Sequence, residues 1–336
     1  MSNNNTSAIG LFAGAGGLDL GFRQAGVKTV AAFDLSEAAV KSYNFNAKRK
    51  ISSVLNLATR KPPEIIAVAE SRCDKHTTKP KLVLGGPPCQ GFSKGNASAD
   101  PNDPRNKLAY RYIDALIGID QWSNIDAFVF ENVPCLRSPR HLPRFRRILR
   151  KLEKAGYVVF EDEINSANFG VPQTRRRLFL VGFNKRLKIT EFDFPNPMKK
   201  YLDKPLTVRD AIAHLPKAAF RSNGMSAKDI PYHPNHWTSQ PVSNKFATQN
   251  FNSGRSFRRL EWDKPSPTVA YGNREIHIHP NGKRRLTILE AMLLQGFPET
   301  YELRGNFSQQ VAQVSNAVPP PVAKSIAKAV LSKLDS

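Results

Sequence analysis

Short apolar runs alternate with amphipathic stretches along the first half of the chain. The runs that predict strands are Ser7–Phe12, Thr29–Phe33, Leu82–Leu84 and Ala127–Phe130. The stretches that predict helices are Leu18–Gln24, Ser36–Asn46, Asn106–Gln121 and the basic His141–Ala155. Strands that alternate with helices are typical of a sheet covered on both faces. The pattern therefore predicts an α/β fold with a doubly wound, mainly parallel sheet.

The alternation ends after the last of these helices. Tyr157–Asn165 and Arg177–Phe183 are both strand-like, and only the loop of Ala167–Arg176 separates them. Because a parallel connection would need a crossover helix, we expect these two strands to pair as an antiparallel hairpin.

A less regular region follows, from about Asn184 to Thr287. Proline, asparagine, serine and charged residues dominate it, and helix signals are few. Helical periodicity returns at Thr287–Gln295 and Pro321–Leu334. We therefore expect a second, smaller and irregular domain at residues 186–299, and a larger domain of residues 1–185 that residues 300–336 complete.

The charge balance changes this picture by indicating a partner. The 336 residues contain 50 lysines and arginines against 28 aspartates and glutamates, a net charge of +22. Residues 184–288 alone hold 19 basic and 8 acidic side chains, so half of the surplus lies in under a third of the chain. A polyanion, usually a nucleic acid, is the common partner of so basic a protein, and a merely solvated basic surface is the alternative.

Cysteine content and hydropathy exclude several classes of protein. The three cysteines, Cys73, Cys89 and Cys135, form no C-x-x-C pair, which excludes a disulfide scaffold and suits a reducing cytoplasm. No apolar run approaches the ~20 residues that cross a bilayer, and no secretory signal is visible, so no membrane role is expected. Histidine and cysteine spacing predicts no metal site.

A glycine-rich turn follows the first predicted strand and opens the first predicted helix. It reads Leu-Phe-Ala-Gly-Ala-Gly-Gly at residues 11–17, and Asp34 follows the next strand. Glycines let the backbone approach a ligand, and a carboxylate after the second strand can bind ribose hydroxyls, so the pair indicates an adenosine-type cofactor. The G-x-G-G spacing argues against a nicotinamide dinucleotide, and a plain tight turn is the alternative.

The segment Gly-Gly-Pro-Pro-Cys-Gln-Gly-Phe-Ser at residues 85–93 follows another buried strand. Cys89 therefore lies at the carboxyl edge of the sheet, where α/β proteins place ligands. Prolines before it and glycines around it predict an exposed nucleophile, whereas a structural cysteine would have apolar neighbours. Glu131 ends the Ala127–Phe130 strand at the same edge and can act as an acid with a raised pKa, unless it is only a surface strand end.

These segments, taken in order, resemble the bacterial DNA (cytosine-5)-methyltransferases of restriction–modification systems. Further matching segments are V-P-Q-T-R-R-R-L-F-L-V-G at 171–182, R-L-T at 285–287 with Glu290, L-Q-G-F-P at 294–298 and S-N-A-V-P-P at 315–320. The resemblance runs from residue 9 to about residue 325. It implies the fold of S-adenosylmethionine-dependent methyltransferases, with a catalytic and cofactor-binding domain followed by a target-recognition domain.

The resemblance also assigns roles to individual residues. Cys89 matches the nucleophile that adds to cytosine carbon 6, and Glu131 matches the residue that hydrogen-bonds ring nitrogen 3. Arg175 and Arg177, with Gln173 before them, match residues that hold the target nucleotide and its phosphates. The residues implied to line the S-adenosylmethionine site are Phe12, Gly14, Gly16, Gly17, Leu18, Asp34, Asn56, Pro87, Asn316 and Val318.

One position departs from the family pattern. Family members usually have an aspartate after the third strand, facing the adenine amino group, and residues 51–57 contain none. Asn56 is the candidate substitute, through its side-chain oxygen. For reading DNA bases, we expect Arg258, beside aromatic residues, and Arg274, after a glycine turn, because arginine pairs bidentately with guanine. Contacts to the DNA backbone alone are the alternative.

The expected function is methylation of carbon 5 of a cytosine in a short specific sequence of duplex DNA, with S-adenosylmethionine as donor. Base flipping and covalent addition of Cys89 are the expected mechanism. We expect a cytoplasmic, nucleoid-associated monomer that needs no protein partner. Two alternatives stay open at this point: a tRNA cytosine-5 methyltransferase and a catalytically silent DNA-binding homologue.

Overall fold

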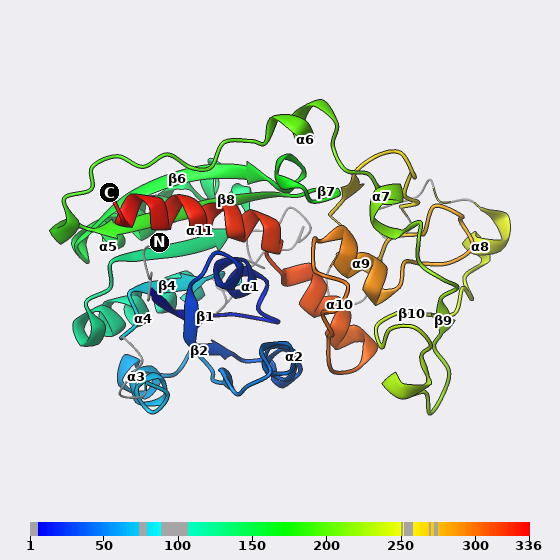
Figure 1. The fold of residues 1–336 in the computed structure, drawn as a ribbon, viewed down its shortest axis with the longest axis horizontal. Coiled ribbons are helices and arrows are strands. Elements are labelled where there is room, and N and C mark those ends of the chain that lie inside the picture. The colour runs from blue at the N-terminus through cyan, green and yellow to red at the C-terminus, as the bar shows by residue number, and fades with distance from the viewer. Residues whose placement is uncertain are drawn as a thin grey trace.

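The structure is a computed structural model of the protein. It describes residues 6–73, 79–88, 107–249, 251, 258–268, 270–271 and 275–336. Its centre is a seven-stranded sheet with the order β3-β2-β1-β4-β5-β8-β6 (Figure 1). The strands are β1 (Ser7–Leu11), β2 (Lys28–Asp34), β3 (Ser52–Val54), β4 (Leu82–Gly85), β5 (Ala127–Asn132), β6 (Tyr157–Asn165) and β8 (Arg176–Asn184).

All neighbouring strands from β3 to β5 pair parallel, and β8 pairs antiparallel with both β5 and β6. The predicted α/β fold, the mainly parallel sheet and the β6–β8 hairpin are therefore confirmed. Because Leu11 pairs with Gly85, and Gly85 with Phe130, the ends of β1, β4 and β5 lie side by side at one edge. This edge brings together motifs that are far apart in the sequence.

Helices cover both faces of the sheet. They are α1 (Gly17–Gln24), α2 (Glu37–Ala47), α3 (Pro62–Glu70), α4 (Leu108–Ser123), α5 (Leu142–Lys154) and α11 (Pro320–Leu334). One hydrophobic core joins α3, α4 and α5 to the sheet, and a second core joins α1 and α11 to the opposite face (Figure 1). The doubly wound arrangement predicted from the alternating pattern is thus confirmed.

The region between β8 and α9 consists of short elements, none of them longer than five residues among the described ones. The helices are α6 (Lys199–Asp203), α7 (Val208–Ile212) and α8 (Asn244–Thr248). The strands are β9 (Ala219–Phe220), β10 (Trp237–Thr238), β11 (Ser266–Pro267), β12 (Ala270–Tyr271) and β13 (Glu275–Ile276), and β11 pairs with β7 (Gln173–Thr174). Among the described residues, the 3-10 helices are Pro134–Arg137, Ser166–Phe169, Lys185–Leu187 and Ala227–Asp229. The short elements between β8 and α9 agree with the irregular character expected from the sequence.

Helices α9 (Ile288–Leu294) and α10 (Phe307–Asn316) anchor this irregular region. A third core joins them to α7 and to residues around β10 and β13. The amphipathic pattern predicted α9, but α3 and α10 were missed. In α10 the buried face carries Gln310 and Gln313 beside its apolar residues, which masks the apolar stripe.

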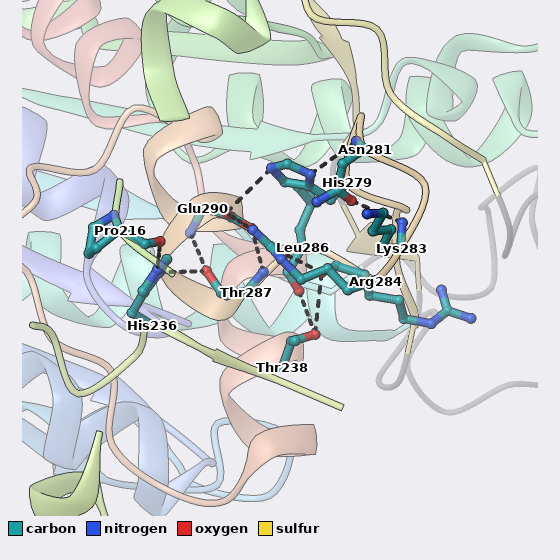
Figure 2. A network of polar contacts seen from close by, with 11 residues as sticks. Pro216, His236, Thr238, His279, Asn281, Lys283, Arg284, Leu286, Thr287 and Glu290 are labelled. Atoms are coloured by element: carbon teal, nitrogen blue, oxygen red, sulfur yellow. Dashed lines mark hydrogen bonds and ion pairs between the residues drawn. The ribbon is translucent and has the colours of Figure 1, made fainter. Parts of the chain in front are cut away.

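A buried polar network fixes α9 to the chain that precedes it (Figure 2). The carboxylate of Glu290 is 1% exposed and accepts two hydrogen bonds of 2.7 Å from the guanidinium of Arg284 and one from the backbone N–H of Thr287. The ring of His236 lies between the Thr287 hydroxyl and the Pro216 carbonyl, at 3.2 and 2.9 Å. Burial alone would raise the pKa of Glu290, but the hydrogen bonds and charge of Arg284 outweigh it and hold that pKa below its ordinary value.

Candidate active site at the carboxyl edge of the sheet

The glycine turn after β1 adopts a conformation that ordinary residues avoid. Phe12, Gly14 and Gly16 have φ angles of 53°, 55° and 90°. The carboxylate of Asp34, at the end of β2, accepts hydrogen bonds of 2.8 Å from the backbone N–H groups of Gly14 and Ser36. Burial raises the pKa of Asp34. The structure therefore brings Asp34 and the glycine turn together, as the sequence predicted, and Asp34 also closes the turn.

Close packing also explains why residues 16 and 17 of the turn are glycines. A Cβ on Gly17 would lie 2.3 Å from the carbonyl oxygen of Val318, so the turn contacts the segment before α11 directly. A Cβ on Gly16 would lie 2.7 Å from the ring of Tyr43. Leu18 is buried in the core between α1 and α11 and lies at the start of α1. The predicted cofactor residues from both ends of the chain therefore meet here.

A pocket of about 480 Å³ opens beside Asp34, at the ends of β2 and β3. Its lining residues are Leu35, Val54, Leu55, Asn56, Thr59, Arg60 and Glu64. Leu35 is 66% exposed and lines the pocket, so its side chain is open to an apolar contact with a ligand. Sequence reasoning identified Asn56 but missed the other members. An apolar residue directly after Asp34 was the signal available for Leu35.

Asn56 has a partner of its own in the structure. Its side-chain oxygen accepts a hydrogen bond of 3.1 Å from the backbone N–H of Ala58, which forms a local turn. A carbonyl oxygen has two lone pairs, so this bond leaves capacity for one more donor. The role of Asn56 toward an adenine amino group stays a prediction.

The segment that leads to Cys89 starts at the same edge. Pro87 is buried, and its carbonyl oxygen accepts a hydrogen bond of 3.3 Å from the side chain of Asn132 at the end of β5. A Cβ on Gly86 would lie 3.0 Å from a carboxylate oxygen of Glu131, so this glycine lets the two strand ends approach. Cys89 itself lies outside the described residues.

Glu131 is only 7% exposed, so the alternative of a surface strand end is wrong. Its carboxylate lies 3.1 Å from Nε of Arg177, which enters from the start of β8. Burial raises the pKa of Glu131, while the charges of Arg177 and Arg175 act in the opposite direction. Burial therefore favours the protonated form of this carboxyl group, which can donate a hydrogen bond.

Arg175 is 2% exposed, which sequence reasoning did not anticipate for a residue of a basic loop. Its Nη2 donates to the carbonyl oxygen of Ser315 at 3.0 Å, and its Nε and Nη1 have no hydrogen-bond partner among the described residues. Burial, together with the charge of Arg177, lowers its pKa. A buried guanidinium with two unsatisfied donors is suited to binding an acceptor that enters the site.

Gln173 is completely buried in the structure. Its amide nitrogen donates to the carbonyl of Leu294 at 3.1 Å and to the side chain of Gln295 at 2.7 Å. Gln173 therefore ties β7 to the end of α9, a structural role that the sequence did not predict. Its contact with DNA stays a prediction.

The remaining predicted residues lie at the surface or outside the described residues. Asn316 is exposed at the end of α10, two residues before Val318. Arg258 is exposed, and its carbonyl oxygen accepts a hydrogen bond of 2.9 Å from the backbone N–H of Ile278. Arg274 lies outside the described residues, and its role as a base reader, like that of Arg258, stays a prediction.

The described parts of the chain bear on metal and membrane roles. Within those parts, histidine, cysteine, aspartate and glutamate side chains form no group of three that could hold a metal ion. Over the same residues, no helix combines the length and the hydropathy needed to cross a bilayer.

The chain is similar to known proteins over its full length. The family model for C-5 cytosine-specific DNA methylase matches residues 6–332. Type II methyltransferase M.MthTI of Methanothermobacter thermautotrophicus is 32% identical, with 98% of each chain covered, and M.FnuDI of Fusobacterium nucleatum is 32% identical, with 97% of this chain and 94% of the relative covered.

The fold is shared with solved structures. A protein from E. coli, described as a DNA modification methyltransferase encoded within a prophage, has a TM-score of 0.78 at 22% identity, with 98% of this chain and 100% of that chain covered. The S. pombe Dnmt2 methyltransferase has a TM-score of 0.65 at 16% identity, with coverage of 98% and 100%. The geometry at the sheet edge and the match to the family model agree, and the chain belongs to the family of C-5 cytosine-specific DNA methylases.

Proposed function

We propose that this enzyme methylates carbon 5 of a cytosine within a short specific sequence of duplex DNA, as the methylase of a restriction–modification system. The observation that carries the proposal is the buried pair Glu131 and Arg175, with the half-buried Arg177, beside the segment that leads to Cys89. A carboxyl group of raised pKa and a guanidinium with free donors suit recognition of a flipped base. The curated relatives are named Type II methyltransferases, which supports the biological setting.

The residues at the glycine turn fit S-adenosylmethionine as the methyl donor. The turn is bare of side chains at Gly14, where a Cβ would meet nothing within 4 Å, and Asp34 and the pocket of about 480 Å³ lie beside it. We assign the methionine end to Phe12, Gly14, Gly16, Gly17 and Leu18, with Val318, Asn316 and Pro87 nearby. We assign the ribose to Asp34, and the adenine to Leu35 and Asn56. When bound, this donor supplies an electrophilic methyl group.

The cytosine ring has to be activated because carbon 5 is a poor nucleophile. In the proposed mechanism the Cys89 thiolate forms a bond to carbon 6 of a cytosine that has left the base stack. Glu131 donates a hydrogen bond to nitrogen 3 and offsets the charge that develops there. Once carbon 5 carries the new methyl group, it loses its proton to a base, the bond from Cys89 to carbon 6 breaks, and the thiolate is released.

The arginines act on the target nucleotide rather than on the ring chemistry. Arg175 would direct its two free donors at an acceptor of the flipped nucleotide, and Arg177 would hold Glu131 in place while contacting phosphate. Gln173 would hold the start of this loop in place through its bonds to Leu294 and Gln295, and its contact with DNA is part of the proposal. Arg258 and Arg274 would read bases, supported by the basic surplus of the surrounding region. We place the enzyme in the cytoplasm, on the nucleoid, as a monomer.

One experiment tests the proposal against its alternatives. The protein is mixed with tritiated S-adenosylmethionine and either duplex DNA or tRNA, beside the variant Cys89→Ser. We expect label in DNA only, and none with Cys89→Ser, because a serine hydroxyl is far less ionised than a thiol. Cys73→Ser is the matched control and should keep substantial turnover. Label in tRNA would favour the tRNA methyltransferase, and absence of any transfer would favour a silent DNA-binding protein.

The covalent step has its own test. Duplex DNA with 5-fluorocytosine at the target should trap the enzyme when the donor is present, because fluorine cannot leave carbon 5 as a proton does. Peptide mapping should place the adduct on Cys89. An adduct on another residue, or none, would refute the covalent mechanism.

A further inference from the structure

A short segment between α9 and α10, Tyr301–Arg304, is held from two sides by asparagine side chains, and we call it the bridging segment. Asn46 of α2 accepts from the backbone N–H of Glu302 at 2.9 Å and donates to its carbonyl at 2.7 Å. Asn235, just before β10, does the same to Leu303, at 2.8 and 2.9 Å. Two consecutive residues are thus held from different parts of the fold. Glu302 is held by α2, which flanks the sheet, and Leu303 is held by the irregular region.

The next residue extends this attachment. The backbone N–H of Arg304 donates to the hydroxyl of Ser42 at 2.7 Å, and its carbonyl accepts from the side chain of Gln313 at 2.8 Å. Asn235 is fully buried and Leu303 is 3% exposed, so water does not compete for these bonds. The backbone of the bridging segment is therefore fixed on both sides.

Tyr301 connects the bridging segment to the glycine turn. Its hydroxyl donates a hydrogen bond to the carbonyl oxygen of Ala15, and its ring packs against Phe297 with centroids 5.0 Å apart. The side chain is only 4% exposed. A Cβ on Gly16 would lie 3.3 Å from the same hydroxyl, so the turn and Tyr301 are in close contact.

This contact fixes one peptide plane of the turn. The carbonyl of Ala15 and the N–H of Gly16 belong to the same planar unit, so holding one atom sets the direction of the other. The N–H of Gly16 donates to the carbonyl of Ala13 at 2.9 Å within the turn, and the Tyr301 hydroxyl holds the oxygen end from outside the turn. Gly14 and Gly16 both have positive φ, and glycine populates negative φ about as readily, so the turn gains from a restraint.

We propose that Tyr301 is a positioning residue for binding of the methyl donor, and that Asn235 supports it from the irregular region through Leu303. The inference rests on the proposed function, because it takes the glycine turn as the donor site. Tyr301 does not touch the reacting atoms. It keeps the turn in the conformation that binds the donor, so its loss weakens donor affinity rather than the chemical step.

The test compares Tyr301→Phe with Tyr232→Phe. The first variant loses only the hydroxyl, since the ring still packs against Phe297. The control loses a hydroxyl that donates to Glu299, two residues from Tyr301, and its own side chain is 58% exposed. The probe is S-adenosylhomocysteine, titrated by calorimetry without DNA. We expect its Kd to rise about fivefold in Tyr301→Phe, the effect of one hydrogen bond, and to stay unchanged in the control.

Steady-state kinetics and a second variant complete the test. KM for S-adenosylmethionine should rise with Kd in Tyr301→Phe, while kcat stays within about twofold. Asn235→Ala should weaken binding of the probe as well, and the double variant should lose little more than either single one, because both act through one path. The rise in melting temperature that S-adenosylhomocysteine causes is measured on the same samples. It reports the affinity of any variant that is too unstable for calorimetry.

The outcomes separate the inference from the proposed function. An unchanged Kd in Tyr301→Phe, or a lower melting temperature without a change in Kd, overturns the positioning role. A wild-type protein that fails to bind S-adenosylhomocysteine overturns the proposed function, and with it this inference.

Discussion

Removal of the positive charge beside Glu290 should destabilise the protein strongly. In the variant Arg284→Met, the two 2.7 Å hydrogen bonds from the guanidinium are lost, and the carboxylate stays 1% exposed with the N–H of Thr287 as its remaining short donor (Figure 2). His279 lies 3.8 Å from the carboxylate, and burial lowers its pKa, which favours its neutral ring. A buried ion that loses its partner costs about 3–5 kcal/mol of unfolding free energy.

The assay is urea unfolding at pH 8, followed by circular dichroism. The double variant Arg284→Met with Glu290→Gln should recover about half of the loss or more, since a neutral amide needs no counter-charge. Arg209→Met is the matched control, because its ion pair with Asp263 is exposed, and it should change the midpoint little.

The pH dependence gives a further check on the same variant. In the wild type, the lowered pKa of Glu290 contributes stability above the unfolded-state pKa near 4.5, and this stability is lost as pH falls through the lower folded value. In Arg284→Met the uncompensated carboxyl group should take up a proton more readily. The loss of unfolding free energy relative to the wild type should therefore be smaller at pH 5 than at pH 8. A loss below about 1 kcal/mol, or an equal loss at both pH values, would refute the reasoning.

Three further predictions concern single side chains. Glu131→Gln should lower the rate of methyl transfer about 100-fold or more in single-turnover assays, because an amide cannot supply the proton, and a change below threefold would contradict its role. Burial raises the pKa of Asp19 from 3.8 to about 6, so wild-type stability falls as pH rises through this window. Asp19→Asn should therefore equal the wild type near pH 4 and exceed it by up to about 3 kcal/mol at pH 8 in urea unfolding, and a constant difference would exclude this cause. Arg258→Ala and Arg274→Ala should each relax specificity at one base pair by about 1–3 kcal/mol when methylation is profiled over near-cognate sites, and a uniform loss would mean phosphate contacts.

The segments of the fold that could be predicted are those whose signal is local. An apolar strand followed by a glycine turn and a helix predicts β1, the turn and α1, because each depends on neighbours a few residues away. The β6–β8 hairpin followed from the absence of a helix between its strands. Helix α3 was missed because its Ile65, Ile66 and Val68 are β-branched and favour strands.

The residues of the candidate site were predicted, but their burial and their neighbours were not. The sequence placed Glu131 and the glycine turn at one edge, since the carboxyl ends of parallel strands meet there. The resemblance to the methyltransferase family added the arginines, which enter from the start of the antiparallel strand β8. Only the tertiary structure decided that Glu131 and Arg175 are buried, that Gln173 supports α9, and that Leu35 borders a pocket.

Contacts between distant segments depend on packing that no local pattern records. Tyr301 lies 286 positions from Ala15, and Asn235 lies 68 positions from Leu303, yet each pair is hydrogen-bonded. A tyrosine or an asparagine in the sequence has many possible partners, and its burial selects one. The sequence by itself thus determined the α/β sheet and the order of the motifs along its edge. The packing of α9, α10 and the bridging segment against that edge decided how the glycine turn is held, because buried polar groups must find partners wherever the fold brings them.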